Sequence, residues 1–90
     1  MLITNDDLYK KQYSINELEE NINQLYGKTI LCTQIINAEF CAKYILNENY
    51  SDGVEEDYLY SVDYIMRKQP HITEKELVYW IEKIPNAYYM

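Results

Sequence analysis

The sequence predicts an all-α fold, a small bundle of four to five short helices around a central apolar helix at about residues 29–47. The most apolar run, residues 30–46, contains no Gly or Pro and repeats its apolar positions at helical spacing. A pattern typical of helix starts occurs three times along the chain. No segment has the features of a strand. The 90 residues therefore form a single helical domain, 1–90.

The central run predicts a helix that is apolar on most of its surface. Its apolar residues fall on one arc about 100° wide, and Ala38 and Ala42 at the middle let a partner helix approach closely. The opposite side is only weakly polar. Such a helix needs neighbours on several sides, so we expect the rest of the chain to pack around it. The arc consists of Leu31, Ile35, Ala38, Ala42, Ile45 and Leu46.

Three helices are predicted by capping boxes, in which a hydroxyl caps a free N–H and an acid three residues later bonds back. They open helices at about residues 5–12, 15–26 and 74–84. Gly27 would end the second in the left-handed conformation, and Pro85 would end the third. The capping pairs are Thr4 with Asp7, Ser14 with Glu17, and Thr73 with Glu76.

A further helix is predicted at about residues 53–69, after a loop at 47–53. Asp52 and Glu55 would cap its start, and Pro70 would end it because the residue before proline avoids helical geometry. Tyr60 and Tyr64 lie one turn apart and off its apolar stripe, so we expect both rings to be exposed.

Composition limits the function classes. The net charge of −7 argues against nucleic acid or an anionic membrane as a direct partner, because both attract basic surfaces. No charge-free apolar run is long enough to cross a membrane, and the acidic N-terminus does not resemble a signal peptide, so we expect a cytoplasmic protein. Cys32 and Cys41 lie on opposite faces of the predicted central helix and are expected to be free, buried thiols.

Catalytic chemistry is not expected. The single histidine, His71, lies in a turn between helices, and no Ser, Cys or Asp is placed to form a nucleophile–base pair with it. A calcium loop aligned on Gly53 fails because Tyr50 and Leu59 would stand at ligand positions. The sequence thus predicts neither a metal nor a cofactor, and no enzyme.

An acidic run is the main functional lead. From residue 48 to residue 63 there are six acids, interleaved with tyrosines, and no Lys, Arg or His. Acids in the first turn of a helix are also explained by the helix dipole, so a solvated helix start is the competing interpretation. A surface of carboxylates and tyrosines suits an Arg/Lys-rich groove. The candidate protein-binding residues are Glu48, Tyr50, Asp52, Glu55, Glu56, Asp57, Tyr60, Asp63 and Tyr64.

Two functional hypotheses follow. The first is a non-enzymatic inhibitor that mimics nucleic acid and occupies a basic groove of a partner protein. Anti-CRISPR and anti-restriction proteins from phages and mobile elements work in this way, and the likeness is one of size and charge. The second is a helical regulatory domain that dimerises or binds a partner through an apolar, aromatic face. Its candidate residues are Tyr79, Trp80, Tyr88 and Tyr89.

Overall fold

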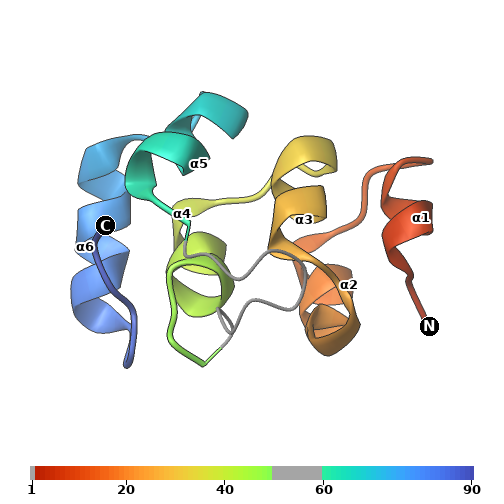
Figure 1. Ribbon diagram of the computed structural model, residues 1–90, viewed down its shortest axis with the longest axis horizontal. Coiled ribbons are helices and arrows are strands. Elements are labelled where there is room, and N and C mark those ends of the chain that lie inside the picture. Colours follow the sequence, from red (N-terminus) through yellow and green to blue (C-terminus); the bar gives the residue numbers. More distant parts are fainter. Residues whose placement is uncertain (1, 50–59) are drawn as a thin grey trace.

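The computed structural model describes residues 2–49 and 60–90, and these residues form an all-α fold (Figure 1). Within these ranges there is no strand, and an isolated bridge pairs Asn47 with Ala87. In Figure 1, α1 lies at one end of the molecule, α6 at the other, and α4 between α3 and α6. The elements are α1 (Asn5–Leu8), α2 (Ile15–Glu20), η1 (Ile22–Gln24), α3 (Gly27–Thr33), α4 (Ala38–Phe40), η2 (Cys41–Ile45), α5 (Val62–Lys68) and α6 (Glu74–Lys83).

All three predicted capping boxes are present. In α6, the Thr73 hydroxyl accepts a hydrogen bond from the Glu76 N–H, and the Glu76 carboxylate accepts one from the Thr73 N–H at 3.0 Å. The boxes at the starts of α1 and α2 have the same reciprocal bonds. The first two helices end earlier than predicted, at Leu8 and Glu20. Local sequence therefore determines where these helices begin, but not how far they extend.

The prediction of one continuous central helix at residues 29–47 is wrong. The run forms α3 and α4–η2, which are separated by an extended segment at residues 34–37. Gln34 has an extended backbone, and Asn37 caps α4 by accepting a hydrogen bond from the Phe40 N–H at 2.8 Å. Ile35, predicted to lie on the buried arc, is 69% exposed.

Buried glutamines account for this break, because their amides bond the main-chain groups that a continuous helix would pair internally. Gln69 donates to the carbonyls of Leu31 and Gln34 at 2.8 and 2.6 Å, and accepts from the Ile36 N–H at 3.2 Å. Gln34 donates to the Leu8 carbonyl at 2.9 Å and accepts from the Tyr13 N–H at 2.7 Å. These partners are 21 to 38 residues away in sequence, so a local pattern does not reveal them.

A second departure from ideal geometry follows the break. Residues Cys41–Ile45 form a π-helical turn, which the Leu46 N–H closes on the Cys41 carbonyl at 2.7 Å. The Asn47 side chain donates to the Ala42 carbonyl at 3.2 Å and to the Pro85 carbonyl at 3.0 Å. A buried asparagine therefore ties the end of this turn to the C-terminal segment.

Two other predicted boundaries are wrong. Gly27 does not end a helix but begins α3, where an added Cβ would lie 3.1 Å from the Tyr60 ring. Its role is close approach between segments, which a glycine permits. The helix predicted at 53–69 begins at Val62, capped by Ser61, so Tyr60 precedes it. The predicted caps Asp52 and Glu55 lie outside the described residues.

The core joins both ends of the chain. Fully buried side chains come from α1, α2, α3, α4, η2, α5 and α6, and include Leu8, Leu18, Phe40, Ile65 and Leu77. Among the residues described, no helix has the length and apolar character that crossing a membrane requires.

Candidate functional site

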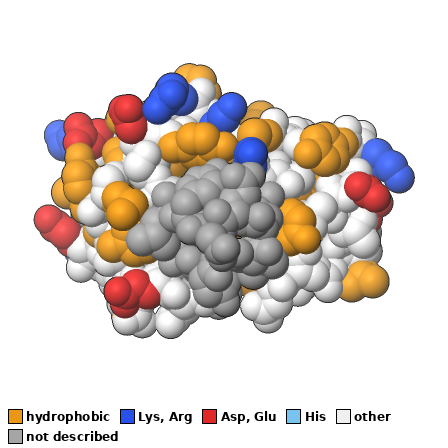
Figure 2. Space-filling view, in the orientation of Figure 1, with side chains coloured by type: hydrophobic (Ala, Val, Ile, Leu, Met, Phe, Trp, Pro, Cys, Tyr) orange, Lys and Arg blue, Asp and Glu red, His pale blue; other side chains and the backbone are white. Residues whose placement is uncertain are grey.

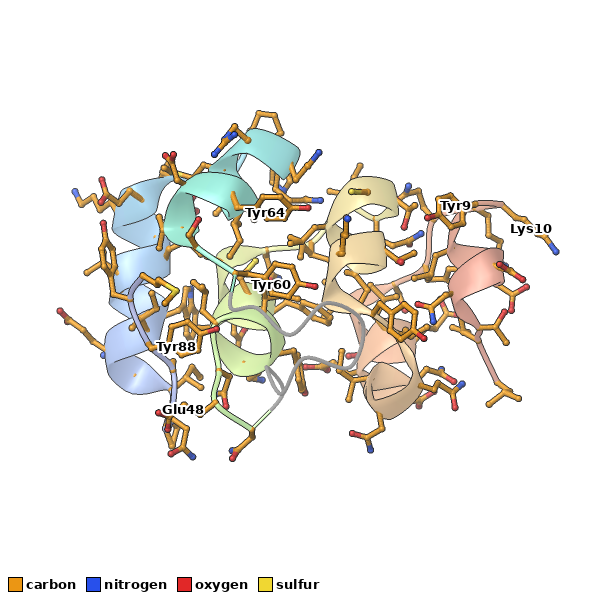
Figure 3. The ribbon with its side chains drawn as sticks, viewed as in Figure 1. Tyr9, Lys10, Glu48, Tyr60, Tyr64 and Tyr88 are labelled. Carbon is orange, nitrogen blue, oxygen red and sulfur yellow. The ribbon has the colours of Figure 1, made fainter. Side chains whose placement is uncertain are left out.

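The predicted acidic surface is only partly described by the structure. Five of its nine candidate residues fall outside the described ranges: Tyr50, Asp52, Glu55, Glu56 and Asp57. The other four are Glu48, Tyr60, Asp63 and Tyr64, and three of these are labelled in Figure 3. Their positions bear on how much of the surface a partner can reach.

Glu48 is exposed and has a fixed backbone. Its N–H donates to the Asn86 carbonyl at 3.1 Å, and the Asn47 side chain next to it is held in the core. The Glu48 carboxylate makes no ion pair with any described residue. It lies at the opposite edge of the view in Figure 3 from α5, the helix on which Asp63 stands.

Tyr60 is not exposed as predicted: it is 9% exposed and belongs to the core. The reason is the later start of α5, since Tyr60 precedes the helix cap Ser61 and packs close to Gly27. Tyr64 is half-buried against the core, and its ring centroid lies 5.8 Å from that of Tyr60. Lys68 covers the Tyr64 ring at 5.6 Å. The two tyrosines thus stabilise the packing of α5, and the expectation that both rings face solvent was wrong.

Asp63 is exposed, on the first turn of α5. Its carboxylate lies 3.6 Å from the Arg67 guanidinium, four residues along the helix. Both side chains are about three-quarters exposed or more, so solvent screens this pair and its contribution is small. A basic groove could compete with Arg67 for this carboxylate.

Several cations contact acids or rings outside the acidic run. Within residues 2–49 and 60–90, the described ion pairs and ring contacts involve six Lys and Arg residues. Asp63 alone among these partners belongs to residues 48–63. The pairs are Lys10 with Asp7, Lys43 with Glu19 and Glu39, Arg67 with Asp63, Lys11 with Tyr13, Lys68 with Tyr64, and Lys83 with Tyr79.

The aromatic residues of the alternative hypothesis differ in exposure. Tyr79 and Tyr89 are more than half exposed, whereas Trp80 and Tyr88 are half-buried against the core. The Tyr79 and Trp80 rings meet edge to face at 5.3 Å. The Tyr89 hydroxyl donates to the Glu74 carboxylate, and this bond raises the pKa of Tyr89. The exposed rings are therefore already in contact with neighbouring side chains of α6.

The two thiols lie in different environments, which corrects the expectation that both are buried. Cys32 is exposed at the end of α3, and Cys41 is buried in η2. Burial raises the pKa of the Cys41 thiol to about 12. The two do not share a helix, because the chain breaks between them.

His71 lies in the turn before α6, as predicted. Its Nε2 is 2.6 Å from the Ile36 carbonyl oxygen, to which it donates a hydrogen bond. The histidine therefore holds the extended segment 34–37 against the α5–α6 turn. In the described part of the chain, no group of three or more potential ligand side chains could hold a metal ion.

A hollow that the sequence patterns did not indicate lies between α1 and α3. Its volume is about 390 Å³, within the size range of binding sites for small ligands. The sequence feature that could have indicated this hollow is the basic pair Lys10–Lys11, which lies in a segment without acids. Figure 3 shows Tyr9 and Lys10 at this end of the molecule. The lining residues are Leu8, Tyr9, Lys10, Lys11, Gln12, Cys32 and Thr33.

No protein-family model, curated protein or solved structure matches this chain. Functional inference therefore rests on the chain's own residues: an acidic run without Lys, Arg or His, exposed tyrosines on α6 and in the C-terminal segment, and a basic hollow beside α1.

Proposed function

We propose that this protein is a non-enzymatic module that binds a basic partner protein through the acidic residues between Glu48 and Asp63. The observation that carries the proposal is the composition of this run: residues 48–63 hold six acids and no Lys, Arg or His. A run of negative charge that contains no base is suited to an Arg/Lys-rich partner.

A partner can reach both ends of the run. Glu48 and Asp63 are exposed, and the ion pair of Asp63 among the described residues is with a solvent-screened arginine. Tyr60 is buried, so we do not include it among the residues that contact the partner. The sharper form of the proposal is an inhibitor that presents carboxylates in place of phosphates inside a nucleic-acid groove, as a phage or mobile-element protein would. It predicts competition between this protein and DNA for the partner.

The test uses an arginine-rich peptide, labelled with a fluorophore, as the basic probe. We expect the variant Glu55→Lys, Glu56→Lys, Asp57→Lys to lose binding, because it reverses three charges within the run. The matched control is Asp6→Lys, Glu20→Lys, Glu82→Lys, which changes the net charge equally at acids with no described ion pair. Circular dichroism checks that both variants keep their helices.

The outcome separates a localised surface from bulk charge. If the two triple variants bind the probe equally weakly, net charge alone attracts the peptide and the proposal fails. If the control binds as the native protein does while the first variant does not, the run is the contact surface. Binding should also weaken steeply with added salt, since screening acts on exposed charges.

The alternative is self-association through α6, favoured by the exposure of Tyr79 and Tyr89. Its contact would be aromatic and would respond little to salt. Sedimentation of the native protein and of Tyr79→Ser at increasing salt tests it. A dimer that persists in high salt and is lost in the variant would favour this alternative over the acidic surface.

A further inference from the structure

Three segments that contain no acidic residue meet on one edge of this acidic protein. They are residues 8–13, 31–37 and 64–73, and together they hold four of the eight Lys and Arg residues. The rest of the chain holds the other four bases and all fifteen acids. The four bases are Lys10, Lys11, Arg67 and Lys68, which we call the basic edge.

Side-chain amides join the first two segments. Gln34 donates to the Leu8 and Lys11 carbonyls at 2.9 and 3.0 Å. Gln12 donates to the Thr33 carbonyl at 2.5 Å and accepts from the Ile35 N–H at 2.9 Å. Lys10 and Lys11 are thereby fixed beside the extended segment that separates α3 from α4.

The third segment is joined to the same stretch from the other side. Gln69 bonds three main-chain groups of residues 31–36, and His71 bonds the Ile36 carbonyl. Arg67 and Lys68 directly precede this glutamine on α5. The extended stretch that breaks the predicted central helix therefore bonds to both basic segments and places the two basic pairs at one edge.

The basic edge is open to solvent. All four bases are exposed, and so is Ile35. Its N–H bonds Gln12, which follows the first basic pair, and the N–H of the next residue bonds Gln69, which follows the second. Figure 2 shows Lys and Arg side chains along the upper edge, over α5 and beside α1, with hydrophobic side chains between them. Tyr9, which is 70% exposed, adds a ring beside Lys10.

The charges of the basic edge are only partly compensated. Asp7 lies 3.9 Å from Lys10, and Asp63 lies 3.6 Å from Arg67, in exposed pairs that contribute little. Lys11 and Lys68 contact tyrosine rings, which leave their positive charge in place. Carboxylates of a partner could therefore gain direct ion pairs here without displacing a buried contact.

We propose that the basic edge binds an acidic segment of a partner protein, whose carboxylates pair with the two basic pairs while a large apolar side chain packs on Ile35. Charge complementarity selects an acidic occupant. The central isoleucine favours a protein over nucleic acid, and the net charge of −7 repels a long polyanion. This surface touches the acidic run through the exposed Asp63–Arg67 pair, but it does not depend on the function proposed for that run.

The test measures fluorescence anisotropy of a labelled glutamate-rich peptide with one central phenylalanine. We expect Lys10→Gln, Lys11→Gln, Arg67→Gln, Lys68→Gln to bind it about tenfold more weakly, as the sum of four modest exposed pairs. The matched control neutralises the other four bases: Lys28→Gln, Lys43→Gln, Lys75→Gln, Lys83→Gln. It changes net charge equally and should bind within about twofold of the native protein. Thermal melts followed by circular dichroism confirm that each variant is folded.

Two further measurements decide the kind of partner. Ile35→Ser should weaken binding of the phenylalanine peptide but not of the same peptide with glutamine in its place. Equal loss in both quadruple variants would overturn the proposal. So would tighter binding of a short DNA duplex than of the peptide, or association of native copies that is lost when the basic edge is neutralised. The last two results would assign the edge to another occupant.

Discussion

Residues 30–46 and residues 73–84 are both predicted as helices from strong local patterns, yet only the second region forms one continuous helix. In α6, the capping box, the apolar spacing and Pro85 all agree, and the helix runs from Glu74 to Lys83. In the first region the apolar spacing is equally regular, but the chain leaves helical geometry at Gln34. The pattern was strong in both, so pattern strength does not explain the difference.

The two regions differ in how far along the sequence their hydrogen-bond partners lie. The groups that begin α6 are satisfied within four residues, by Thr73 and Glu76. Main-chain groups of residues 31–36 are satisfied by the side chains of Gln12, Gln69 and His71, which are 23 to 38 residues away. A buried main-chain group needs a partner from one source or the other. A distant partner can therefore override a local helix pattern.

The largest expected effect comes from removing the distant partner in the first region. Gln69→Ala deletes three hydrogen bonds and leaves the Leu31 and Gln34 carbonyls buried without partners. We expect the free energy of unfolding to fall by about 3 kcal/mol, because unsatisfied buried polar groups each cost a substantial fraction of that. Urea denaturation followed by circular dichroism measures it.

The matched control is Gln12→Ala, which also deletes bonds to this region, those with Thr33 and Ile35. Gln12 is exposed, so water can replace its amide, and we expect a loss of no more than about 1 kcal/mol. Similar losses in the two variants would mean that burial of Gln69 is not what makes the break stable.

This contrast shows how much of the fold the sequence could predict. The helix starts at Thr4, Ser14 and Thr73 were predicted correctly because a capping box is complete within four residues. The break at Gln34 was not predicted, because a glutamine in an apolar run is also compatible with the weakly polar side of a continuous helix. Only the position of Gln69, 35 residues further on, makes it a buried hydrogen-bonding partner.

The candidate sites follow the same rule. Charge runs are visible in sequence, and Glu48 and Asp63 at the two ends of the acidic run are exposed. The burial of Tyr60 depends on where α5 begins, and Ser61 rather than Asp52 marks that start in the described residues. The basic edge could not be assembled from sequence, because its two pairs are brought together by the unpredicted break.

A smaller effect is expected from the locally satisfied region. Thr73→Ala removes the hydroxyl that caps α6 and should lower the free energy of unfolding by about 1 kcal/mol, while Thr73→Ser should change it by only a few tenths. The same urea titration measures both. A loss in the alanine variant as large as that of Gln69→Ala would contradict the ranking of distant over local bonds.

Acid titration of Thr73→Ala gives a second test of this capping box. Hydrogen bonds from the Thr73 N–H and hydroxyl lower the pKa of Glu76 below its usual 4.5. A carboxylate with a lowered folded-state pKa stabilises the protein above its unfolded-state pKa, and this contribution is lost as pH falls through the folded-state pKa. Thr73→Ala deletes the hydroxyl bond, so its stability should decline less between pH 4.5 and lower pH than that of the native protein. An unchanged pH profile would mean that the hydroxyl does not bond Glu76 in solution.

The smallest effect on stability is expected at Cys32, which also reports whether the central run is broken. Cys32→Ser should change the free energy of unfolding by no more than about 0.5 kcal/mol, because the thiol is exposed. A continuous helix with neighbours on several sides would shield both thiols, whereas the broken run exposes Cys32 and leaves Cys41 buried with a pKa of about 12. A disulfide reagent at mildly alkaline pH should therefore label one thiol in the native protein, none in Cys32→Ser, and the second only after unfolding. Rapid labelling of both thiols in the native protein would contradict the packing of η2 in the core.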